Sequence, residues 1–162
     1  MKNFGLYTLN EQGVPCVAEP SLIVSTALSC LNDQVQRGCT LDSPSTVKAF
    51  LSLKLGALEH EVFAVLFLDS KLALIEYKEM FRGTLAQAAV YPREIVKEAL
   101  ALNAQSIILA HCHPSGVNTP SRSDELLTQT IKKAAALLDI RVADHIVVGG
   151  GSAASFAELG LL

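Results

Sequence analysis

Two histidines, a serine and an aspartate stand close together in the segment AHCHPSGVNTPSRSD, residues 110–124. His111 and His113 are two residues apart, and Ser121 and Asp124 follow in the pattern H-x-H-x7-S-x2-D. Two imidazoles and one carboxylate are suitable ligands for a divalent metal such as zinc. Three protein ligands leave a fourth position open for water, which is the arrangement of a catalytic zinc site. The spacing therefore predicts a metal-dependent hydrolase that binds one Zn2+ per chain.

A strand that ends at the histidines would bring these ligands together. In the predicted strand 106–111, residues i and i+2 point to the same side, so both imidazoles can converge while Cys112 points away. Pro114 ends the strand, and Asp124 falls in the first turn of the next helix, where its side chain can return to the site. Ser121 and Asp124 also fit a helix capping box, and one carboxylate oxygen cannot fully serve both roles. The residues alone leave both interpretations open.

A zinc hydrolase also needs a group that moves protons. Zinc lowers the pKa of its bound water to about 7, but a base must accept the proton and deliver it to the leaving amine. Glu61 is the best-placed candidate because it heads the apolar run 61–69, although it also fits the plain polar end of a strand. Ser121 could donate a hydrogen bond to the oxyanion that forms when water attacks an amide. The pair Asp144-His145 lies inside an apolar strand, and we interpret His145 as a core histidine without a ligand role.

Length and composition favour one globular domain. The chain has 162 residues, of which 50% are hydrophobic and 18% charged, with a formal net charge of -3. The basic residues are scattered, so DNA is a possible partner that the charge does not favour. No run is long and apolar enough to span a membrane, and the first residues lack a signal-peptide core, which predicts a cytoplasmic protein with reduced cysteines. The sequence does not indicate the oligomeric state.

The elements that must position these residues follow from hydrophobic periodicity and turn residues. Residues 1–42 are expected to form an N-terminal extension that is helical from Pro20 to Leu31, and residues 43–162 to form the domain that carries the motif. That domain is expected to begin with a helix from Pro44 to about Leu58 that is capped by Ser43. A hairpin over 61–69 and 72–81 follows and ends at Arg82-Gly83-Thr84. The remaining elements are a helix from Pro92, strand 106–111, helix 122–138, strand 140–150 and a short strand or helical turn over 155–160. This order predicts an α/β fold with a mixed β-sheet flanked by helices.

The motif, with a glutamate upstream, resembles the JAMM motif of the JAB/MPN metalloprotease superfamily. The segments EVFAVLFLDSKLALI, FRGTLAQAAVYPREIVKEALALNAQSIILAHCHPSG and DIRVADHIVVGGG are similar to RadC-like proteins, and the resemblance covers about residues 44–162. It implies a mixed sheet flanked by helices, of the cytidine-deaminase-like type. It also implies the roles of the site residues: zinc held by His111, His113 and Asp124, Glu61 as the general acid/base, and Ser121 at the oxyanion.

Three features depart from the RadC-like pattern. Cys112 stands where asparagine is common, Tyr91 stands where histidine often precedes Pro-Arg-Glu, and residues 1–42 do not show the helix-hairpin-helix region suited to DNA backbone contact. None of them changes a motif position. We therefore favour a zinc peptidase or isopeptidase that uses metal-activated water on a peptide or protein substrate. The alternative is a DNA-repair or mobile-element accessory protein with a structural or idle metal site.

Overall fold

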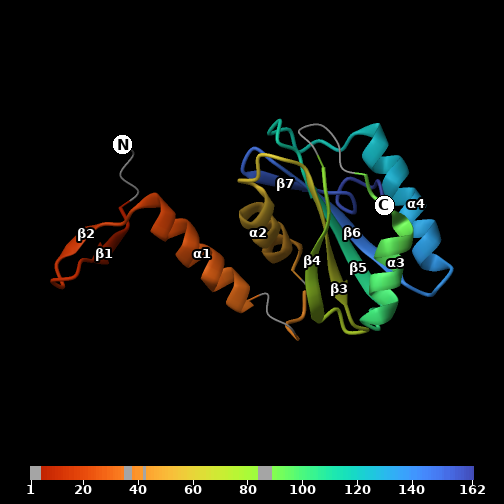
Figure 1. Cartoon of the computed structure of the whole chain (residues 1–162), viewed down its shortest axis with the longest axis horizontal. Coiled ribbons are helices and arrows are strands. Elements are labelled where there is room, and N and C mark those ends of the chain that lie inside the picture. The colour runs from red at the N-terminus through yellow and green to blue at the C-terminus, as the bar shows by residue number, and fades with distance from the viewer. Residues whose placement is uncertain (1–4, 35–37, 42, 84–88) are drawn as a thin grey trace.

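The computed structural model describes residues 5–34, 38–41, 43–83 and 89–162. Its centre is a five-stranded sheet with the order β4-β3-β5-β6-β7 (Figure 1). The strands are β3 (Val62–Leu68), β4 (Leu74–Arg82), β5 (Ser106–Cys112), β6 (Arg141–Gly149) and β7 (Ser152–Ser155). Strands β5 and β6 pair in parallel, and the other three neighbouring pairs are antiparallel. The predicted mixed sheet is confirmed.

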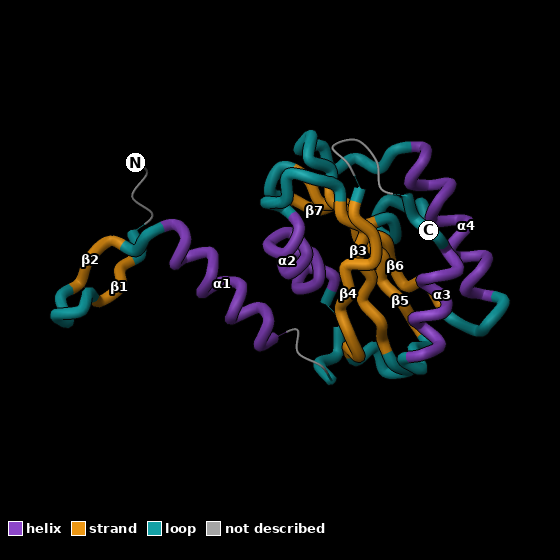
Figure 2. The backbone as a smooth tube through the Cα atoms, viewed as in Figure 1, coloured by secondary structure: helices purple, strands orange, loops and turns teal. Residues whose placement is uncertain are grey.

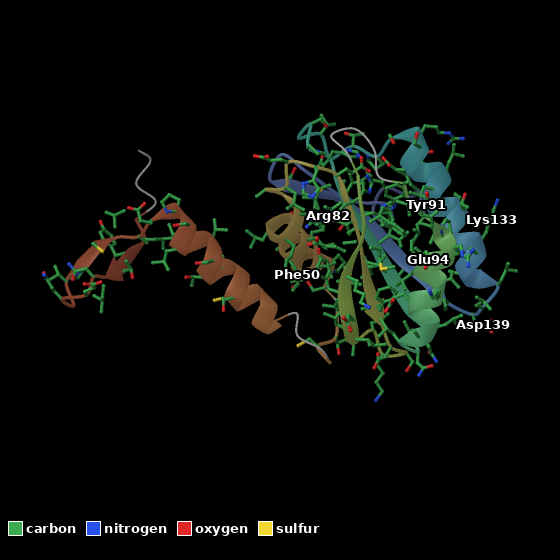
Figure 3. All side chains as sticks on the ribbon, in the orientation of Figure 1. Phe50, Arg82, Tyr91, Glu94, Lys133 and Asp139 are labelled. Atoms are coloured by element: carbon green, nitrogen blue, oxygen red, sulfur yellow. The ribbon has the colours of Figure 1, made fainter. Side chains whose placement is uncertain are left out.

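Helices cover both faces of this sheet. Helix α2 (Pro44–Leu55) packs on one face, and helices α3 (Pro92–Ala101) and α4 (Arg122–Ala136) pack on the other (Figure 2). Figure 3 shows Phe50 on the α2 side and Lys133 on the opposite side. Every residue of β3 and β5 is buried, as expected for strands that are covered on both faces. The motif-bearing strand β5 is therefore the central strand of the sheet and is covered on both faces.

Two predicted helix ends are wrong by two or three residues. Helix α2 ends at Leu55 instead of Leu58, and the Ser43 hydroxyl contacts the Ser45 hydroxyl at 2.8 Å without capping the helix. Helix α4 ends at Ala136 instead of residue 138. Its end is set by Asp139, which has a positive φ of 57° and turns the chain back toward β6.

The hairpin between β3 and β4 is present, with a later start of the second strand than predicted. The Asp69 carboxylate accepts hydrogen bonds from the N–H groups of Lys71 and Ala73, both at 2.8 Å, so these residues belong to the turn. Strand β4 then runs from Leu74 to Arg82. Thr84, part of the predicted end of the hairpin, lies outside the described residues. Residues 156–160 form turns after β7, so the strand alternative for 155–160 is wrong beyond Ser155.

The N-terminal extension contains an unpredicted hairpin before the expected helix. Strands β1 (Tyr7–Leu9) and β2 (Pro15–Val17) pair antiparallel, and helix α1 runs over Pro20–Gln34. This segment projects from the sheet and its helices (Figure 1). The hairpin and α1 line an open, mostly apolar cavity of about 470 Å³, and none of the candidate site residues lines it. No helix in the described ranges combines the length and the hydropathy that crossing a bilayer requires.

Candidate metal centre

The two motif histidines meet at the end of β5. His111 is the next-to-last residue of the strand and His113 follows its last residue, and their ring centroids are 4.8 Å apart. Their Nε2 atoms lie 3.0 Å from each other. Cys112 points to the opposite face, where it packs on the α2 side and its thiol donates to the His60 carbonyl at 3.5 Å. Burial raises the pKa of this thiol, which disfavours the thiolate form that binds metals.

Asp124 completes a group of three possible ligands from the first turn of α4. Its Oδ1 atom lies 3.4 Å from His111 Nε2, and its Oδ2 atom lies 3.6 Å from His113 Nε2. One ligand atom from each of the three residues lies within 4.8 Å of the others. Burial acts to raise the pKa of the Asp124 carboxyl, but hydrogen bonding and charge from His111, with hydrogen bonds from Ser121, hold it well below its usual range. The group thus offers a carboxylate and two imidazoles, which fit zinc.

The two oxygens of Asp124 have different partners. Oδ2 accepts hydrogen bonds from the N–H and the O–H of Ser121, at 2.7 and 2.6 Å, and the Ser121 hydroxyl accepts from the Asp124 N–H at 3.2 Å. These bonds form the capping box that the sequence left open. Because Oδ1 faces His111, the same carboxylate can cap the helix with one oxygen and bind a cation with the other. A role for Ser121 at an oxyanion requires its hydroxyl to leave Oδ2, and that role stays a prediction.

Glu61 lines the same cavity as two of the three candidate ligands, His111 and Asp124. It directly precedes β3, and its backbone carbonyl accepts a hydrogen bond from the Gly83 N–H at 2.8 Å. Its side chain is half-buried and lines a cavity of about 190 Å³ together with His111 and Asp124. The other residues that line this cavity are Phe63, Val90, Ser123 and Leu127. A carboxylate that lines this cavity beside two candidate ligands is suited to proton transfer.

The loop after β5 fixes the ring of His113. Its Nδ1 atom lies 2.7 Å from the Val117 carbonyl, and because a carbonyl only accepts, Nδ1 carries the ring proton. In a neutral ring, the lone pair is then on Nε2, the atom directed to the ligand group. The loop lies so close to Gly149 that a Cβ there would be 2.8 Å from the Val117 carbonyl carbon. Metal-binding histidines commonly donate their second N–H to a carbonyl in this way.

Two polar residues behind His111 were not assigned to the site from the sequence. His145, on β6, places Nε2 at 2.8 Å from His111 Nδ1 and Nδ1 at 2.6 Å from Thr128 Oγ1. Burial lowers the pKa of His145 well below its usual range, and charge from His111 adds to the effect, so the ring is neutral. His145 is a core residue outside the ligand group, as interpreted. Its contact with a candidate ligand depends on the pairing of β5 with β6, which no local pattern reveals.

Comparisons with known proteins agree with the resemblance noted in the sequence. A family model described as RadC-like JAB domain matches residues 41–161. A UPF0758 protein of Leptothrix cholodnii is 53% identical over 158 residues, which cover 98% of this chain and 71% of the relative. A UPF0758 protein of Methylibium petroleiphilum is 56% identical over 145 residues, which cover 90% of this chain and 65% of the relative.

A third relative, a UPF0758 protein of Nitrosococcus oceani, is 53% identical over 132 residues, which cover 82% of this chain and 59% of the relative. The chain thus spans between 59% and 71% of the length of these three relatives. The family model matches about three quarters of the chain, over the whole sheet and the ligand group. The chain belongs to the RadC-like JAB domain family.

Proposed function

We propose that the chain is a zinc-dependent hydrolase of the JAMM type that cleaves a peptide or isopeptide bond in a protein substrate. The observation that carries this proposal is the convergence of His111, His113 and Asp124 within 4.8 Å, beside a cavity that Glu61 also lines. Three such ligands leave a coordination position for water. Membership in the RadC-like JAB family supports the proposal, whereas the name UPF0758 states no activity.

The chain's own residues divide the work of hydrolysis between them. Bound zinc would supply a water of lowered pKa and polarise the substrate carbonyl. The Glu61 carboxylate accepts the proton of the attacking water and delivers it to the leaving nitrogen. The Ser121 hydroxyl, once released from Asp124 Oδ2, donates a hydrogen bond to the oxyanion. Phe63, Val90 and Leu127 provide the apolar part of the cavity lining.

Zinc removal should abolish cleavage. We expect metal-stripped protein to leave a mixture of peptides and isopeptide-linked proteins intact, and zinc addition to restore cleavage at defined bonds. New amino termini, and lysine side chains released from isopeptide bonds, are measured by mass spectrometry. An Asp139→Asn variant, changed at an exposed acid outside the cavity, serves as the control and should cleave normally. Equal cleavage by stripped protein, or no cleavage by zinc-loaded protein, would contradict the proposal.

DNA binding separates the hydrolase from the accessory-protein alternative. Four basic residues that are candidates for a local positive face each lie within 4.0 Å of a glutamate. These pairs are Arg82–Glu79, Arg93–Glu94, Lys97–Glu94 and Arg122–Glu125. Phosphate contacts dominate non-specific affinity, so this chain should bind duplex DNA no tighter than about 10⁻⁵ M near physiological salt. A titration of duplex and single-stranded DNA measures this, and sub-micromolar binding with a steep salt dependence would favour the accessory protein.

A further inference from the structure

A relay of hydrogen bonds behind the ligand group runs from the Asp124 backbone carbonyl through Thr128 and His145 to His111. The Thr128 hydroxyl fixes which atom donates in each of these bonds. Its Oγ1 atom lies 2.6 Å from the Asp124 backbone carbonyl and 2.6 Å from His145 Nδ1. A carbonyl oxygen only accepts, and a hydroxyl has one proton, so the Thr128 proton goes to Asp124. Oγ1 must then accept from His145, whose proton therefore stands on Nδ1.

The position of the proton on His145 determines which group donates in its hydrogen bond with His111. The ring is 0% exposed and lies against Phe156, with centroids 4.6 Å apart, and against Phe63, with centroids 5.6 Å apart. A neutral imidazole has one N–H and one lone pair, and with the proton on Nδ1 the Nε2 atom must accept. The partner of Nε2 is His111 Nδ1 at 2.8 Å, which therefore donates.

The relay determines which nitrogen of His111 is available to a metal. With the proton on Nδ1, a neutral His111 ring has its lone pair on Nε2, the atom that faces His113 Nε2 at 3.0 Å and Asp124 Oδ1 at 3.4 Å. The relay begins at the backbone of one candidate ligand residue, Asp124, and ends at the ring of another, His111. Both ends are thereby held in one geometry through α4 and β6.

We propose that Thr128 and His145 are positioning residues that keep His111 in the tautomer able to bind zinc through Nε2. This inference rests on the metal site of the proposed function. Thr128 acts at a distance, because its hydroxyl contacts neither the His111 ring nor the cavity. A merely structural pair would stabilise the fold without determining which nitrogen of His111 carries the proton.

Thr128→Val tests the relay because it keeps the shape of the side chain and removes the hydroxyl. The Nδ1–H of His145 then has no acceptor, so His145 should carry its proton on Nε2 and donate to His111 Nδ1. His111 is thereby driven to carry its own proton on Nε2, the ligand atom. We expect zinc affinity to fall by about 10- to 100-fold, the usual loss when a partner behind a ligand is removed. Thr128→Ser keeps the hydroxyl and should behave as the wild type.

Thr130→Val is the matched control on the same helix. Thr130 Oγ1 also donates to a carbonyl four residues back, that of Leu126 at 2.8 Å, but it is exposed and away from the ligand group. Ring tautomers are read from long-range proton–nitrogen NMR spectra of metal-free protein, and zinc affinity from competition with a chromophoric chelator. We expect wild type, Thr128→Ser and Thr130→Val to carry the proton of His145 on Nδ1, and Thr128→Val to carry it on Nε2.

Several results would overturn the relay. One is a wild-type spectrum with the His145 proton on Nε2, which needs no variant and no bound metal. Another is a folded Thr128→Val protein that keeps the wild-type tautomers and zinc affinity. A loss in Thr128→Ser as large as in Thr128→Val would assign the effect to packing instead of the hydroxyl. Because the tautomers are measured without metal, they test the relay even if the protein cleaves no peptide. The cleavage assay tests the proposed function separately.

Discussion

Replacing Glu61 with glutamine should reduce hydrolysis by about two to four orders of magnitude, the usual contribution of general acid–base catalysis. Glutamine keeps the size of the side chain at the cavity but cannot accept the proton of the attacking water. Glu61 does not belong to the group of possible ligands found among the described residues, so zinc should stay bound. Single-turnover rates on a bond that the wild type cleaves, with zinc content measured on the same samples, check both expectations.

Glu59→Gln is the matched control for this experiment. Glu59 is an exposed glutamate two residues before Glu61, and it does not line the cavity. The Glu59→Gln variant should cleave at the wild-type rate, which separates the loss of a base from the loss of a negative charge. The assignment of Glu61 is wrong if its glutamine variant loses zinc or remains fully active. The Glu61→Gln variant, with zinc bound and hydrolysis slowed, can be used to capture the unknown substrate.

Replacing His113 with alanine should prevent stable zinc binding. Removal of one of three protein ligands leaves two, and a zinc site requires at least three. The loss of affinity should exceed the roughly 10- to 100-fold that loss of an outer partner costs, so this variant should bind zinc more weakly than Thr128→Val. Elemental analysis after gel filtration measures the zinc retained per chain.

His60→Ala is the control for His113→Ala. His60 lies outside the ligand group, although its carbonyl accepts from the thiol of Cys112 on the other face of the sheet. Its alanine variant should retain as much zinc as the wild type. Full zinc content in His113→Ala, with a normal fold by circular dichroism, would show that His113 is not a ligand.

The sequence predicted the parts of this fold that depend on local patterns. The apolar run 61–69 became a strand buried on both faces, and the two-residue spacing of His111 and His113 placed both rings on one side of β5. Helix ends were less accurate, because the end of α4 depends on Asp139 in the left-handed region and not on hydrophobic periodicity. The hairpin β1-β2 was missed because each strand has only three residues, too few to show alternation.

The candidate site shows the same division between local and long-range information. Pattern alone could not decide whether Asp124 caps the helix or binds a metal, since the answer depends on where each of its two oxygens points. The structure gives Oδ2 to Ser121 and directs Oδ1 at His111. The role of His145 could not be predicted, because its contact with His111 joins residues 34 positions apart through neighbouring strands.

The X-ray absorption spectrum of zinc in the reconstituted wild-type protein is the most direct test of the metal centre. With His111, His113 and Asp124 as ligands, we predict the multiple scattering of two imidazoles and only nitrogen and oxygen neighbours, at about 2.0–2.2 Å. Cys112, buried on the other face of β5, should contribute no sulfur neighbour. A sulfur neighbour near about 2.3 Å, or a zinc spectrum without imidazole scattering, would contradict the site.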